Sequence, residues 1–154
     1  MNVEVISLTS ALIRLGVALA LGLCIGTERQ LHKHTAGVRT FALICLGSAL
    51  AMIVSIYICQ TNTNLLNGDP GRIAAQVLTG IGFIGAGLIL KHGEGVSGLT
   101  TAACVFITSI IGLAAGAGLM LVATIITIIV VLLLASSAFI RTRILHDKNV
   151  RADD

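Results

Sequence analysis

The chain has 154 residues, of which 56% are hydrophobic and only 11% are charged. Soluble domains carry about 25% charged residues, so this composition excludes a water-soluble fold and predicts an integral membrane protein. The hydropathy pattern indicates an all-α bundle. The net charge of +3 is not gathered into a basic patch interleaved with aromatic residues, so no nucleic-acid partner is indicated.

Five apolar stretches predict about five transmembrane helices, since each is close to the roughly 17 to 25 residues that cross a bilayer. They cover about 5–25, 40–59, 71–90, 99–115 and 119–140, so residues 1–140 form one transmembrane domain and 141–154 a charged tail. Lys and Arg are concentrated in the first loop, the second short loop and the tail. The positive-inside rule then predicts an outside N-terminus and a cytoplasmic C-terminus.

The first span contains an arginine, Arg14, whose depth depends on where the span begins. Arg14 is interpreted either as an anchor that reaches the membrane surface or as half of a buried pair with Asp69 or Glu4. Gly22 and Gly26 form a small-xxx-small pair in the same span, which predicts a helix-packing face.

The loop after the first span holds Glu28, Arg29 and Arg39. One interpretation is a loop that sets the orientation, closed by an ion pair between Glu28 and Arg39. The other is a docking surface for a cytoplasmic or membrane partner.

The third span is predicted to be the central helix of the bundle, because small residues lie on two of its faces. Asp69 suits a helix cap and Pro70 the first helical position. The glycines predicted to pack are Gly80, Gly82, Gly85 and Gly87.

Asp69, Arg72 and Gln76 lie at the start of this span with i, i+3, i+7 spacing. They form either a capped helix start, with Arg72 directed to the interface, or a polar pocket for an ion or a partner group. Gln76 lies deeper than an interface residue needs to lie, so both interpretations stay open.

Thr100 and Thr101 open the fourth span and are interpreted as capping residues. A weakly polar stripe follows at helical spacing, and Gly116 to Gly118 predict a tight turn. The stripe consists of Ser97, Thr101, Cys104, Thr108 and Gly112.

No set of nucleophile, base and orienting group is visible, so an enzyme is the least supported class. The segment from Gly80 to Gly85 matches G-x-G-x-x-G, but it lies in a membrane span rather than after a strand, which argues against a dinucleotide site. The four cysteines and four histidines are dispersed, so neither a cofactor nor a metal site is expected.

The chain resembles the membrane domain of the MgtC/SapB family in LGLCIGTERQ (21–30), AGVRTFALICLGSAL (36–50), DPGRIAAQVLTGIGFIGAG (69–87) and GLTTAA (98–103). The resemblance covers most of 12–115. It places the family's signature on Gly26, Glu28, Arg29, Gly37, Arg39, Thr40, Asp69, Arg72, Gln76, Gly80, Gly82, Gly85 and Gly87.

The resemblance implies a multi-pass protein of the bacterial inner membrane with a cytoplasmic C-terminus. Members of the family act in adaptation to low magnesium and in survival inside host cells, and are linked to inhibition of the F-type ATP synthase. The chain is similar to a short form, because about fourteen residues follow the fifth span where virulence-associated members continue into a soluble domain. Thr100 takes the place of an Asn in those members, and Cys104 does not match their Cys.

Two functional hypotheses follow. The first is a regulatory protein that contacts another membrane complex, such as the ATP synthase, or a second copy of itself as a homodimer. The alternative is a small channel or transporter, with Asp69, Arg72 and Gln76 as its outer vestibule and the stripe from Thr101 to Thr108 as its lining.

Overall fold

The computed structural model describes residues 6–32, 34–61, 69–92 and 95–150, with side chains as far as residue 136 in the last range. It contains the helices α1 (Leu8–Leu31), α2 (Val38–Thr61), α3 (Gly71–Gly87), α4 (Leu99–Gly116) and α5 (Met120–Val150). A small antiparallel hairpin of β1 (Leu90–His92) and β2 (Gly95–Ser97) joins α3 to α4. The all-α fold class predicted from the sequence is confirmed.

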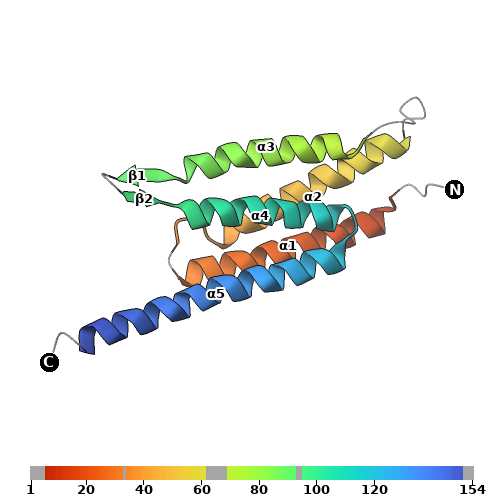
Figure 1. The fold of residues 1–154 in the computed structure, drawn as a ribbon. Helices are drawn as coiled ribbons and strands as arrows, with labels where there is room; N and C mark the ends of the chain where they lie inside the picture. The colour runs from red at the N-terminus through yellow and green to blue at the C-terminus, as the bar shows by residue number, and fades with distance from the viewer. Residues whose placement is uncertain (1–5, 33, 62–68, 93–94, 151–154) are drawn as a thin grey trace.

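Three of the helices, α1, α2 and α4, are long and apolar enough to cross a membrane. A 24-residue helix such as α1 is about 36 Å long, which exceeds the roughly 30 Å of a hydrocarbon core. Helix α5 is apolar throughout Met120–Ser136, the part of it whose side chains are described, and α3 has 17 residues. The chain is therefore a multi-pass membrane protein, and its two ends lie at opposite ends of the bundle (Figure 1).

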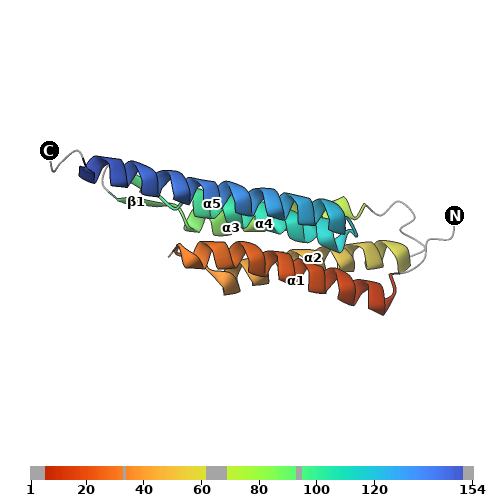
Figure 2. The ribbon, with the colours of Figure 1, turned by 90° about the horizontal axis from the view of Figure 1, so that it is seen from below.

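The helices form two layers, with α1 and α2 in one layer and α3, α4 and α5 in the other (Figure 2). Among the described residues, helix α4 packs against each of the other four helices, whereas the main contacts of α3 are with α4 and α2. The central helix is therefore α4, and the prediction that α3 is central was wrong. The physical reason is that α3 buries only Ile81 and Gly85 and leaves most of its small residues exposed.

The two ends of the bundle are named here by the arginine or glutamate they contain. At the Arg14 end, α1 begins, α2 ends and α4 turns into α5 (Figure 1). At the Glu28 end, α1 ends, α2 and α4 begin, and the hairpin projects beyond α3. The turn at the Arg14 end contains Gly118 with a φ of 93°, which agrees with the predicted tight turn.

The predicted packing glycines divide into two groups. A Cβ atom at Gly22 would lie 2.7 Å from the Phe41 carbonyl oxygen, and one at Gly26 would lie 2.6 Å from Val38 Cα, so both allow α1 to approach α2 closely. Gly85 has ordinary contact with Ala102. In contrast, nothing lies within 4 Å of a Cβ atom built at Gly80, Gly82 or Gly87.

Several element boundaries differ from the predicted spans. Helix α1 continues to Leu31, so Glu28 and Arg29 belong to a helix rather than to a loop. Helix α3 ends at Gly87, before the hairpin, and α5 continues through the predicted tail to Val150. The extension of α1 is explained by burial of Glu28 and Arg29 in its last turn, where Arg29 bonds to Thr101 of α4.

Candidate functional site

The most buried charged residues of the described chain lie at the Glu28 end, between α1 and α4. Glu28 and Arg29 have exposed fractions of only 8% and 3%. Arg29 Nη2 donates a hydrogen bond of 3.0 Å to Thr101 Oγ1 on α4, and Thr101 is itself buried. Glu28, Arg29 and Thr101 are called the Glu28 cluster below.

The Glu28 cluster has unused hydrogen-bonding capacity. Glu28 Oε1 lies 3.1 Å from His32 Nδ1 one turn later, while Glu28 Oε2 and Arg29 Nε are buried and have no hydrogen-bond partner in the described part of the chain. Buried polar atoms are nearly always satisfied by protein or by ordered water. The cluster can therefore accept one further hydrogen bond and donate another, which is the chemistry of a site for water or a small polar ligand.

The expected ion pair between Glu28 and Arg39 is not formed, and this prediction was wrong. Arg39 is exposed on α2, whereas Glu28 is buried and pairs with His32. The cause is the continuation of α1 as a helix, which places His32 one turn from Glu28. Glu28 and Arg29 are thus inaccessible as a docking surface, and Arg39 and the neighbouring Thr40 remain exposed.

The threonines at the start of α4 do not cap it, which corrects a second prediction. The N-cap residue is Gly98, with a φ of 87° and no side-chain capping bond. Thr100 is exposed, whereas Thr101 is directed into the Glu28 cluster. The capping interpretation failed because the hydroxyl of Thr101 accepts a hydrogen bond from Arg29, which lies 72 positions earlier in the chain.

Asp69, Arg72 and Gln76 are all exposed at the Arg14 end. Asp69 Oδ1 accepts a hydrogen bond of 2.8 Å from the Gly71 backbone N–H, so it supports the first residue of α3. Pro70 occupies the N-cap position rather than the first helical position. None of the three predicted pocket residues lines either of the two cavities described below.

Arg14 is bonded to the end of α4 rather than to a carboxylate. Its Nη1 donates a hydrogen bond of 2.9 Å to the Gly116 carbonyl oxygen, where a cation meets the negative end of a helix dipole. The expected partner Asp69 is not bonded to it, and Glu4 lies outside the described residues. Gly118 leaves space for the guanidinium, because a Cβ atom there would lie 3.2 Å from Arg14 Cζ.

Most of the weakly polar stripe on α4 is buried in helix packing. Thr101, Cys104, Thr108 and Gly112 are buried, and Thr108 donates a hydrogen bond of 2.7 Å to the Cys104 carbonyl oxygen in its own helix. The stripe therefore allows α4 to approach α1 and α2, and none of its residues lines either of the two cavities described below.

A model of the MgtC family matches residues 15–143. The chain belongs to the MgtC family. It is 41% identical over 140 residues to an uncharacterized protein of Haemophilus influenzae, covering 88% of this chain and 58% of that protein. It is 51% identical over 104 residues to YhiD of Escherichia coli K12, provisionally named a magnesium transporter, covering 66% of this chain and 48% of YhiD.

Protein MgtC of Brucella abortus is 40% identical over 116 residues, covering 74% of this chain and 45% of that protein. This MgtC-family chain thus spans about half the length of the curated relatives it matches. No solved structure matches it. Membership of the MgtC family, its bacterial relatives and the apolar helices together place the chain in a bacterial inner membrane.

Sequence reasoning missed the hydrogen-bond partners of Arg14 and Arg29 and the role of Gln60. Gln60 Oε1 accepts a hydrogen bond of 3.1 Å from the Ile6 backbone N–H and so connects the end of α2 to the chain before α1. No motif marks this residue. Its position is the available signal. Gln60 is a polar residue at the end of the second apolar stretch, and antiparallel packing places that end beside the start of the first helix.

Proposed function

We propose that this MgtC-family chain is an inner-membrane regulatory protein that acts by contacting other proteins within the bilayer. The observation that supports the proposal is the exposed, glycine-rich surface of α3. Phe83 is 84% exposed, and Gly80, Gly82 and Gly87 have no neighbours that a side chain would contact. Small residues at membrane helix surfaces are typical of places where a second helix packs closely.

An apolar groove between α3 and α4 gives this surface a defined shape. Its volume is about 390 Å³, and small residues from both helices line it, among them Gly82, Gly85, Ala102 and Ala103. Such a groove fits the apolar side chains of a transmembrane helix, because association in lipid depends on close packing rather than on water release. The groove is therefore proposed as the contact surface.

The proposed partner is a subunit of the F-type ATP synthase, whose activity falls when the chain binds it. A second copy of the chain is the alternative occupant of the groove, which would give a homodimer. The Lys and Arg distribution supports an outside N-terminus, with the Glu28 end in the cytoplasm. The name of the E. coli relative associates that protein with magnesium, so we propose that the regulation serves adaptation to low magnesium.

The test is ATP-driven proton pumping in inverted bacterial membrane vesicles with and without the chain, measured alongside the passive proton leak. The proposal predicts lower pumping and an unchanged leak. Gly82→Leu should restore pumping, because the leucine fills the groove and has open space around it in the folded chain. Gly47→Leu on α2 is the matched control, since it also has no neighbour within 4 Å, and should still inhibit.

Equal restoration by both leucine variants would contradict the α3–α4 contact surface, and unchanged pumping with the parent chain would contradict ATP-synthase inhibition.

A raised leak would support the second candidate, a small channel or transporter, which the name of the E. coli relative suggests. That candidate places its vestibule at Asp69, Arg72 and Gln76, which are exposed. Arg72→Ala would then change the leak.

A further inference from the structure

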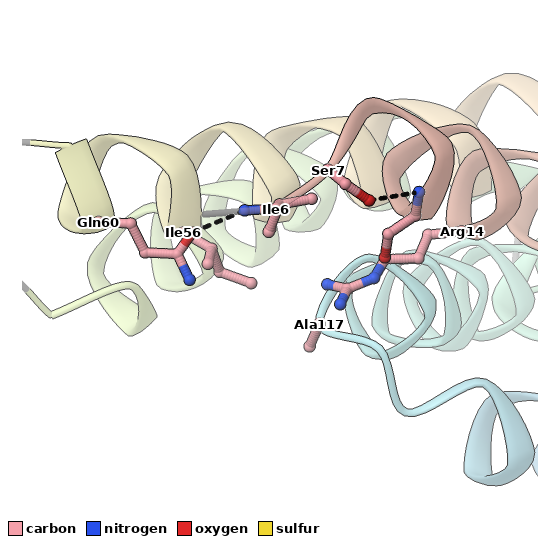
Figure 3. A pocket seen from close by; sticks show the side chains of 7 residues that line it. Ile6, Ser7, Arg14, Ile56, Gln60 and Ala117 are labelled. Atoms are coloured by element: carbon pink, nitrogen blue, oxygen red, sulfur yellow. Dashed lines mark hydrogen bonds between the residues drawn. The ribbon is translucent and has the colours of Figure 1, made fainter. Parts of the chain in front are cut away.

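A second cavity lies at the Arg14 end, away from the α3–α4 groove. Its volume is about 320 Å³, and its polar lining consists of Ser7, Ser10, Arg14 and Gln60. In Figure 3 the Arg14 guanidinium extends from α1 toward Ala117 in the α4–α5 turn, and Gln60 approaches from α2 on the other side. The cavity thus lies between the ends of three helices.

The charge of Arg14 is not balanced by a carboxylate in the described part of the chain. No residue that lines the cavity is acidic, and no ion pair involves Arg14 among the described residues. A guanidinium has five N–H donors, and one of them bonds to the Gly116 carbonyl oxygen. Arg14 Nε is buried and has no partner among the described residues, so the cation retains donors for another acceptor.

The remaining polar groups around the cavity also favour an anion. Ser7 caps α1 by accepting a hydrogen bond from the Ser10 backbone N–H, so the positive end of the α1 dipole lies at the cavity. Gln60 uses its Oε1 atom to accept from the Ile6 N–H, which leaves its Nε2 atom as a donor. Donors therefore come from both α1 and α2, and Arg14 adds a cation to the lining of the cavity.

We propose that this cavity binds an oxyanion, specifically a phosphate group, through Arg14, Gln60 and the start of α1. Arginine recognises phosphate oxygens through paired N–H donors, and a helix N-terminus adds favourable electrostatics. The phosphate belongs either to a lipid headgroup or to a free phosphate compound. Both sources are available there, because helix ends lie at the level of the lipid phosphates whichever way the protein is oriented.

The experiment uses the full chain purified in uncharged maltoside micelles. Inorganic phosphate is titrated by calorimetry. Phosphatidylglycerol is compared by native mass spectrometry with diacylglycerol of the same chains, which lacks the phosphate. Binding of inorganic phosphate identifies a free phosphate site, and selective retention of phosphatidylglycerol alone identifies a lipid site. Binding of neither probe overturns the proposal.

Gln60→Glu tests the assignment of residues. The variant retains the oxygen that accepts from Ile6 N–H but replaces the Nε2 donor with a second carboxylate oxygen at the cavity that Arg14 also lines. Phosphate or lipid binding should fall at least tenfold. Gln30→Glu is the matched control, because Gln30 Oε1 also accepts a backbone N–H, from Val38 at 3.3 Å, at the opposite end of the bundle. Its binding should stay within twofold of the parent.

A second variant keeps the residue assignment testable if Gln60→Glu does not fold. Ser10→Asp places a negative charge at the same cavity, in the first turn of α1, where an acidic residue stabilises a helix. It should fold and should lose binding to the same extent. Parent-like binding in a folded Ser10→Asp or Gln60→Glu variant, or an equal loss in Gln30→Glu, overturns the assignment to this cavity.

Discussion

Gly112→Ala is expected to destabilise the folded chain by about 1–3 kcal/mol, the usual effect of adding a methyl group to a closely packed core. A Cβ atom at Gly112 would overlap the Cys45 carbonyl oxygen and would lie 2.9 Å from Ser48 Cβ. Because the first of these neighbours is backbone, relief requires α2 and α4 to move apart. The measurement is the midpoint of SDS unfolding in mixed micelles, followed by far-UV circular dichroism.

Gly80→Ala is the matched control for this prediction. A Cβ atom at Gly80 has nothing within 4 Å, so the same substitution adds no contact in the folded chain. Alanine also has a higher helix propensity than glycine, by about 1 kcal/mol in water, so stability should be unchanged or slightly higher. Equal destabilisation by the two alanines would show that α4 is not packed against α2 as described.

Thr101→Val is expected to destabilise the chain by about 1.5–3 kcal/mol, the range for a hydrogen bond to a charged group. Valine has nearly the same shape, but it removes the acceptor of the 3.0 Å bond from Arg29 Nη2. Arg29 is 3% exposed and its Nε already has no partner, so water cannot easily replace the lost acceptor. Unfolding in SDS measures this loss too.

Two controls separate the hydrogen bond from the shape of the side chain. Thr101→Ser retains the hydroxyl and should recover most of the stability. Thr100→Val makes the same change at the adjacent, exposed position and should have an effect below about 0.5 kcal/mol. If Thr101→Ser proved as destabilising as Thr101→Val, the methyl group rather than the bond to Arg29 would explain the effect.

The sequence was sufficient to predict the membrane class, the all-α fold and the family, because these depend on composition and on continuous segments. It also indicated Gly22 and Gly26 as packing positions, where α1 does approach α2 closely. It did not identify the central helix. The glycines of α3 and those of α4 have the same local appearance, and only the three-dimensional arrangement determines which of them face another helix.

The candidate site was predicted less completely, because its bonds join distant parts of the chain. Glu28, Arg29 and Thr101 were each singled out, but the bond between Arg29 and Thr101 spans 72 positions and that between Arg14 and Gly116 spans 102. Local spacing favoured closer partners, such as Arg39 for Glu28. The extension of α1 beyond its apolar stretch was also hidden, because its polar last turns resemble a loop when burial is unknown.

The two arginine bonds also have a consequence for the thickness of the surrounding membrane. Arg14 and Arg29 both lie on α1 and are bonded to opposite ends of α4 at Gly116 and Thr101. Fifteen positions separate each pair along its own helix, which corresponds to about 22 Å. A hydrocarbon core is about 30 Å thick, so the two cations are closer together than the two surfaces of an average bilayer. Hydrophobic mismatch should therefore make this protein most stable in thin bilayers, and it should draw shorter lipids around α1 and α4.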